Sequence, residues 1–170
     1  ANRPETTRGS RARELDQVRA IDDVLSRIAG LPHVAGFALW SFNDYGTLRK
    51  KRYARHCGLV DAWRSPKMAA DYLAARFRPE AFVRLVADWR VAPAREGGGD
   101  ERDVVVFTNC DTLRFFVGGV PAGEMRGANP LAVKLPFRDG ALEVRALRGT
   151  ECASDVCLPW GPAARLTIVP

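Results

Sequence analysis

The chain has 170 residues, and its 26 lysines and arginines outnumber its 20 aspartates and glutamates, which gives a formal net charge of +6. Because 46% of the residues are hydrophobic, the chain can bury a core, and broad disorder is excluded. No apolar run approaches the roughly 20 residues that a membrane-spanning helix needs, so we expect no membrane partner. Residues 1–13 are polar and contain arginine, and we expect no signal peptide in them.

The basic residues are dispersed along the chain, and only residues 49–52 form a compact basic run. A nucleic-acid surface normally combines clustered basic residues with aromatic platforms. We therefore interpret this run as a solvated loop and expect no nucleic-acid partner. A nucleic-acid binder remains the alternative that the net charge suggests.

The four cysteines are Cys57, Cys110, Cys152 and Cys157. Zinc sites usually join a closely spaced cysteine pair to a second pair or to histidines. Cys152 and Cys157 have no second pair behind them, and His33 and His56 lie far upstream. The pattern favours buried free thiols or one loop disulfide, and we predict neither a metal nor a cofactor.

An amphipathic helix is predicted from about residue 10, because apolar side chains recur every three or four positions, at Leu15, Val18, Ile21, Leu25 and Ile28. A glycine and a proline at positions 30 and 32 end it. Residues 34–40 (VAGFALW) follow and are almost wholly apolar, which is typical of a parallel strand buried on both faces. The polar residues after this strand occupy the position where barrel enzymes carry their chemistry.

Ser65 and Pro66 predict the start of a second helix, which Arg78 and Pro79 end. From residue 82 the apolar period becomes two. Strands are predicted at residues 82–89, 103–108, 113–117, 131–137, 141–147 and 165–169. Short strands separated by turn residues indicate an antiparallel β-sandwich, and the change of pattern places a domain boundary near residues 77–81.

Four segments occur in a recognisable order. They are residues 36–45 (GFALWSFNDY), residues 58–67 (GLVDAWRSPK), residues 104–117 (VVVFTNCDTLRFFV) and residues 140–146 (GALEVRA). This order resembles glycoside hydrolase family 2, the family of β-galactosidases, β-glucuronidases and β-mannosidases, from about Leu15 to Ile168.

The resemblance implies an α+β composite fold. Residues 1–79 would be the last helix–strand–helix portion of a (β/α)8 catalytic barrel, and residues 80–170 an immunoglobulin-like antiparallel β-sandwich. The implied function is that of the C-terminal part of a retaining, β-galactosidase-like glycoside hydrolase with a carbohydrate substrate. In this family both catalytic glutamates lie on earlier barrel strands. Neither Glu5 nor Glu14 follows an apolar strand, so we predict no catalytic residue in this chain.

The resemblance makes Trp40, Asn43 and Asp44 candidate substrate-binding residues. Trp40 offers a stacking face for a sugar ring, and the two polar side chains offer hydrogen bonds to its hydroxyls. The alternative is that Trp40 is a core residue and that Asn43 and Asp44 are ordinary turn residues. We expect Arg64 and Lys67 to be structural.

The chain departs from the family pattern at residues 54–57 (ARHC), where glucuronidases carry an Asn-x-Lys pair, so recognition of a uronic acid is not implied. The alternative function is a non-catalytic β-sandwich module that binds carbohydrate or protein. A single parallel strand at residues 34–40 favours the glycosidase, because a free-standing sandwich module would not require it. We expect Trp63, Trp89 and Trp160 to lie in the core or at a domain interface.

Overall fold

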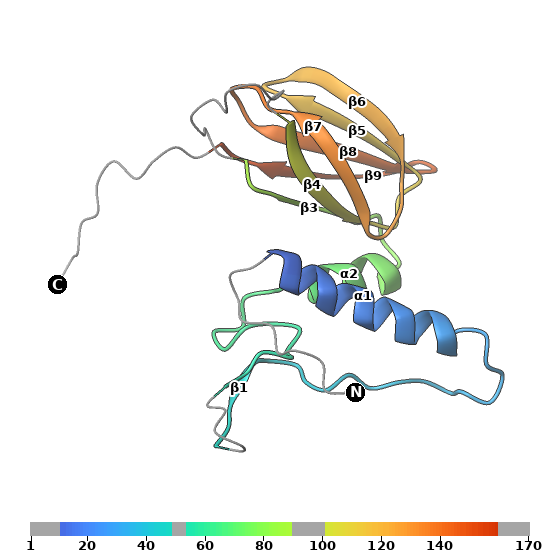
Figure 1. The fold of residues 1–170 in the computed structure, drawn as a ribbon. Helices are drawn as coiled ribbons and strands as arrows, with labels where there is room; N and C mark the ends of the chain where they lie inside the picture. Colours follow the sequence, from blue (N-terminus) through green and yellow to red (C-terminus); the bar gives the residue numbers. More distant parts are fainter. Residues whose placement is uncertain (1–10, 49–53, 90–100, 160–170) are drawn as a thin grey trace. The chain divides into compact units, whose positions relative to one another are not determined.

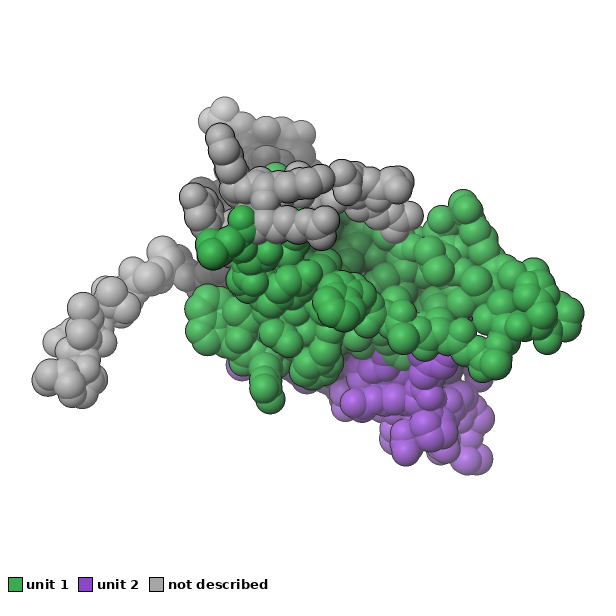
Figure 2. Space-filling model, turned by 90° about the horizontal axis from the view of Figure 1, so that it is seen from below, with its two compact units in different colours: residues 1–73 green, residues 74–170 purple. Residues whose placement is uncertain are grey.

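The computed structural model describes residues 11–48, 54–89 and 101–159 (Figure 1). The chain divides into two compact units, Ala1–Leu73 (unit 1) and Ala74–Pro170 (unit 2), which Figure 2 colours separately. The predicted assignment of residues 1–79 to a barrel and of residues 80–170 to an immunoglobulin-like domain stays a prediction.

Helix α1 (Arg11–Ile28) confirms the predicted amphipathic helix. Its apolar stripe buries Val18 and Leu25, which are 0% and 3% exposed. The second helix, α2 (Met68–Phe77), packs against α1 through the hydroxyl of Tyr72, which donates to Asp22 Oδ1 at 2.5 Å. Because Tyr72 is fully buried, this hydrogen bond satisfies a polar group inside the contact between the helices.

The start of α2 differs from the prediction. Ser65 and Pro66 do not begin the helix, since Pro66 forms an isolated antiparallel bridge with Val60. The helix begins at Met68, whose amide donates to the carboxylate of Glu14 at 3.0 Å. A carboxylate is well placed at a helix N-terminus, where amides lack partners and the helix dipole is positive. A residue of α1 therefore replaces the local cap that the sequence suggested.

The strand predicted at residues 34–40 is not formed, and this prediction was wrong for the described residues. The segment lies outside any named strand, with Phe37 and Trp40 47% and 81% exposed. A parallel strand requires neighbours for its backbone hydrogen bonds, and the described part of unit 1 provides only the two-residue strands β1 (Tyr45–Gly46) and β2 (Ala54–Arg55). The apolar residues of this segment are therefore not buried on both faces as the sequence predicted.

Unit 2 contains two antiparallel sheets that form a β-sandwich (Figure 1). The first has the order β3-β4-β7, with β3 at Val83–Ala87, β4 at Glu101–Thr108 and β7 at Leu131–Pro136. The second has the order β6-β5-β8-β9, with β6 at Val120–Arg126, β5 at Thr112–Val117, β8 at Leu142–Arg148 and β9 at Glu151–Cys157. Five of the predicted strands are confirmed, β6 and β9 were not predicted, and residues 165–169 lie outside the described residues.

Alternate residues of both sheets meet in one apolar core. Trp89 is fully buried there, packs against Phe137 with ring centroids 5.1 Å apart, and donates its indole N–H to the carbonyl of Gly140 at 2.9 Å. Trp89 is thus the core residue that the sequence predicted. Trp63 is 84% exposed within the described chain and is therefore not a core residue, whereas its place at a domain interface stays a prediction. Trp160 lies outside the described residues.

Candidate functional site

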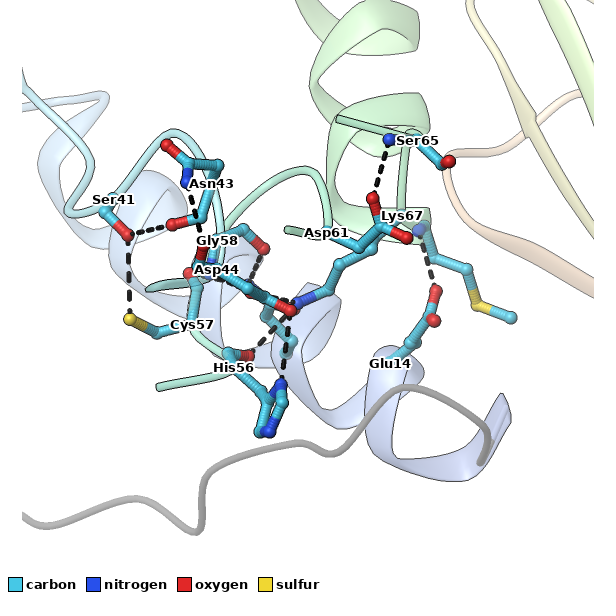
Figure 3. A network of polar contacts seen from close by, with 12 residues as sticks. Glu14, Ser41, Asn43, Asp44, His56, Cys57, Gly58, Asp61, Ser65 and Lys67 are labelled. Carbon is cyan, nitrogen blue, oxygen red and sulfur yellow. Dashed lines mark hydrogen bonds and ion pairs between the residues drawn. The ribbon is translucent and has the colours of Figure 1, made fainter. Parts of the chain in front are cut away.

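The turn after Trp40 lies against residues 58–60 of the same unit (Figure 3). The amide of Asp44 donates to the carbonyl of Val60 at 3.0 Å, and the amide of Val60 donates to the carbonyl of Phe42 at 3.0 Å. A Cβ atom on Gly58 would lie 2.3 Å from backbone atoms of Asn43 and Asp44. Only glycine permits this close approach, so Gly58 fixes the two segments against each other.

A buried ion pair holds this turn. The carboxylate of Asp44 and the ammonium group of Lys67 are 3.1 Å apart, with side chains only 5% and 1% exposed. Asp44 also accepts from the amide of Gly58 at 2.8 Å and lies 3.3 Å from Nδ1 of His56, while Lys67 donates to the carbonyl of His56 at 3.1 Å. These additional hydrogen bonds offset the cost of removing both charges from water.

The three predicted substrate-binding residues lie in one turn but in different environments. Trp40 is exposed and donates its indole N–H to the hydroxyl of Tyr45 at 3.2 Å, with the two rings edge to face. Asn43 is half-buried, and its amide donates to the carbonyl of Asp44 at 2.7 Å. The carboxylate of Asp44 is buried among its internal partners. Trp40 thus presents an open aromatic face, whereas Asp44 acts as an internal anchor.

No known protein-family profile matches the chain. A β-glucuronidase of Formosa agariphila is 30% identical over 102 residues, which cover 59% of this chain and 10% of that protein. The chain resembles a short part of the β-glucuronidases. The resemblance to β-glucuronidase-like glycosidases that the sequence predicted is therefore confirmed, and the chain spans about a tenth of the length of this curated relative.

Solved structures of β-glucuronidases and a β-glycosidase also match most of this chain over a short part of their own length. The Parabacteroides merdae enzyme is 25% identical with a TM-score of 0.61, and the match covers 89% of this chain and 21% of that one. Bacteroides uniformis β-glucuronidase 2 has a TM-score of 0.70 at 21% identity, with 87% and 19% covered. A β-glycosidase from Bacteroides vulgatus has a TM-score of 0.68 at 21% identity, with 81% and 18% covered. At such identities the last two show the shared fold alone.

The buried ion pair of Lys67 agrees with the structural role predicted for this residue, whereas the role of Arg64 stays a prediction. Asp61 is buried and accepts from the amides of Trp63 at 3.0 Å and Ser65 at 2.7 Å, while Arg64 is exposed with a φ of 67°. The buried partner of Lys67 is Asp44.

Sequence reasoning missed the contributions of Gln17, Glu14 and His56. The side-chain amide of Gln17 donates to the carbonyls of Cys57 and Gly58, both at 3.0 Å, and so ties α1 to the site loop. No local pattern signals such contacts, because each partner lies 40 or more residues away along the chain. For His56 the only sequence signal was its place just before Gly58.

Among the described residues, no group of three or more potential metal ligands occurs. All four cysteines have free thiols, with Cys110 buried and Cys152 exposed. The described helices include none that is long and apolar enough to cross a membrane.

Proposed function

We propose that this chain is the C-terminal part of a retaining glycoside hydrolase, in which residues 1–79 complete a catalytic (β/α)8 barrel and residues 80–170 form an immunoglobulin-like supporting domain. The observation that carries the proposal is the apolar segment at residues 34–40, which ends at the exposed Trp40 and continues into a turn fixed by a buried ion pair. The similarity to β-glucuronidases supports it.

The exposure of the apolar segment supports the proposal that a strand of a longer parent chain packs beside it. Residues 34–39 carry valine, phenylalanine and leucine, yet Phe37 is 47% exposed and the segment belongs to no strand. Exposure of apolar side chains to water is unfavourable and favours packing of this segment against another strand. Strands preceding this segment in a longer parent chain would provide that pairing.

The sugar would lie against Trp40. The indole of Trp40 is exposed and can stack on a sugar ring, and the side-chain amide of Asn43 lies in the adjacent turn. Asp44, the third residue of the predicted set, would not contact the sugar. It would hold the turn in place through its contacts with Gly58 and Lys67. The substrate is a carbohydrate, and residues 54–57 leave open whether it carries a uronic acid.

The catalytic carboxylates would come from the parent. A retaining glycosidase requires two carboxyl groups about 5–5.5 Å apart, one of them a nucleophile. Glu14 caps α2 in this structure, and Glu5 lies outside the described residues. One of the structural neighbours was solved covalently bound to cyclophellitol-6-carboxylate aziridine, which supports a mechanism with a covalent intermediate.

The test uses the parent reading frame that contains this chain. We expect it to encode a glutamate at the end of an apolar strand within a few tens of residues before Ala1, and the parent to hydrolyse aryl β-galactosides or β-glucuronides. Trp40→Ala should lower kcat/KM about tenfold, because aromatic contacts contribute about 0.5–1.5 kcal/mol beyond the apolar area that they bury. Trp63→Ala is the matched control, since both indoles are more than 80% exposed here.

A parent without that glutamate, or equal kcat/KM for the Trp40→Ala and Trp63→Ala variants, would contradict the proposal. The isolated chain should show no hydrolysis of either glycoside. Its amides at residues 34–39 should exchange rapidly with solvent, because their strand partners are missing. Strong protection there in a monomer would instead favour the non-catalytic binding module.

A further inference from the structure

The outward face of the four-stranded sheet in unit 2 carries an ordered set of side chains. Leu113 and Phe115 of β5 point into the core, so the alternate residues of that strand face outward, and the same holds for β8 and β9. The strand register places the outward residues of β5, β8 and β9 in three rows: Thr112-Leu147-Cys152, Arg114-Arg145-Ser154 and Phe116-Glu143-Val156.

A surface hollow of about 290 Å³ lies over these rows. Its lining includes Phe116 and Leu147 as apolar surface, Arg114 and Arg145 as cations, and the hydroxyl of Ser154. Its volume lies at the lower limit of the about 300–1,000 Å³ of ligand pockets, which leaves room for a compound of one ring. An apolar wall with a few converging polar groups is the usual composition of a small-molecule site.

The middle row places two like charges opposite each other on neighbouring strands. Arg114 and Arg145 are direct cross-strand partners, and like charges at opposed positions destabilise a sheet. Each is relieved by one glutamate, since Arg114 donates from Nε to Glu124 at 2.7 Å and Arg145 donates from Nε to Glu143 at 2.5 Å. Departures from local stability rules concentrate at functional sites, which makes this row the most informative feature of the face.

The glutamates engage only part of each guanidinium group. An arginine has five N–H donors, and the contact to glutamate uses the one on Nε. The side chains of Arg114 and Arg145 are 53% and 59% exposed, so their ends are accessible from solvent. The hydrogen bond and the charge of Glu143 raise the pKa of Arg145, a side chain that is positively charged in proteins in any case.

Aromatic packing orients one of these cations. The guanidinium carbon of Arg145 lies 4.6 Å from the ring centroid of Phe116, on the neighbouring strand. A guanidinium held over an aromatic face has lost much of its rotational freedom before any ligand arrives. Glu143 lines the hollow and Glu124 pairs with Arg114 beside it, so the two arginines and the two glutamates balance in charge. The guanidinium N–H groups that the glutamates leave accessible therefore provide the preference for an anion over a neutral compound.

We propose that this hollow binds a carboxylate-bearing ring compound, with the carboxylate between Arg114 and Arg145 and the ring against Phe116 and Leu147. Arginine recognises carboxylates through paired, parallel N–H donors, which lysine does not offer. The site goes beyond the function proposed above, because all its residues lie in unit 2 and none belongs to the turn of Trp40. Either proposal can therefore fail without the other.

The test is isothermal titration of the whole 170-residue chain with glucuronate, benzoate and methyl β-glucoside. We expect saturable binding of at least one carboxylate with a Kd of about 1 mM, as befits a single small ring, and at least tenfold weaker binding of the neutral glycoside. Arg114→Gln and Arg145→Gln should each weaken the carboxylate at least about tenfold, through loss of a charge-assisted hydrogen bond. Arg126→Gln is the matched control, because Arg126 is an exposed arginine of the neighbouring strand β6 that does not line the hollow.

Preference for glucuronate would identify a sugar acid as the ligand type, and preference for benzoate an aromatic acid. Equal affinity for the neutral glycoside would overturn the proposal, as would no binding of either carboxylate at concentrations of about 50 mM. Equal effects of the three arginine substitutions would also overturn it, since they would indicate a diffuse charge effect. Amide spectra of each variant establish that the sandwich remains folded. Phe116→Leu, which keeps both arginines, should weaken binding because it removes the aromatic surface for the ligand ring and the contact that orients Arg145.

Discussion

Replacing Lys67 by methionine tests whether the buried ion pair holds the turn after Trp40. The substitution keeps a side chain of similar length but removes the ammonium group that lies 3.1 Å from the carboxylate of Asp44. The carbonyl of His56 also loses its hydrogen bond from the lysine. Asp44 remains buried, with the amide of Gly58 as its closest remaining donor.

Breaking a buried ion pair from one side costs about 3–5 kcal/mol, because the remaining charge stays desolvated. That figure applies here since Asp44 and Lys67 have side chains only 5% and 1% exposed. Combining Lys67→Met with Asp44→Asn removes the isolated charge, so the double variant should recover at least about 1.5 kcal/mol. Asp23→Asn on α1 should cost at most about 0.5 kcal/mol, because its pair with Arg27 is exposed.

Hydrogen exchange reports this loss at the turn itself. The amides of Asp44, Val60 and Lys67 donate to backbone carbonyls within the site. Local opening made easier by 3–5 kcal/mol should accelerate their exchange between about 100-fold and a few thousand-fold. Rates in Lys67→Met within threefold of the parent chain would refute the reasoning, as would a double variant no more protected than the single one.

Three further substitutions probe packing. Gly58→Ala would bring a methyl group 2.3 Å from backbone atoms and should cost about 3 kcal/mol in thermal unfolding of unit 1, whereas Gly36→Ala, with open space around it, should be neutral. Trp89→Ala should cost about 3–5 kcal/mol in urea unfolding, against at most about 0.5 kcal/mol for the exposed Trp63→Ala, and equal effects would contradict the core assignment. Asn109→Ala removes three hydrogen bonds to the segment that enters β3 and should cost about 2–4 kcal/mol by the same urea assay; a stability unchanged from the parent would count against these contacts.

Helix α1 was predictable because its information is local. The burial of Val18 and Leu25 follows from their spacing alone. Residues 34–40 show the opposite case, since apolar composition indicates a buried strand but a strand also needs partners. Strand β6 was missed because Pro121 and Gly123 interrupt the alternating pattern, although the neighbouring strand β5 still pairs with it.

The candidate site was predictable only in part. Trp40, Asn43 and Asp44 come together because they are neighbours in the sequence. The role of Asp44 was not visible in the sequence, because its partner Lys67 lies 23 residues away and is chosen by the folded chain. The sequence predicts no catalytic role for Glu14 because no apolar strand precedes it, and in the structure its carboxylate accepts from the first amide of α2.

Strand β6 has a consequence for self-association. It lies at the edge of the four-stranded sheet, and the ladder shifts register between Phe115 and Phe116 opposite Pro121. Proline has no amide hydrogen to donate, and a bulge twists an edge away from a flat template. This border therefore resists the addition of a strand from a second molecule, so the sheet does not extend by polymerisation from that side.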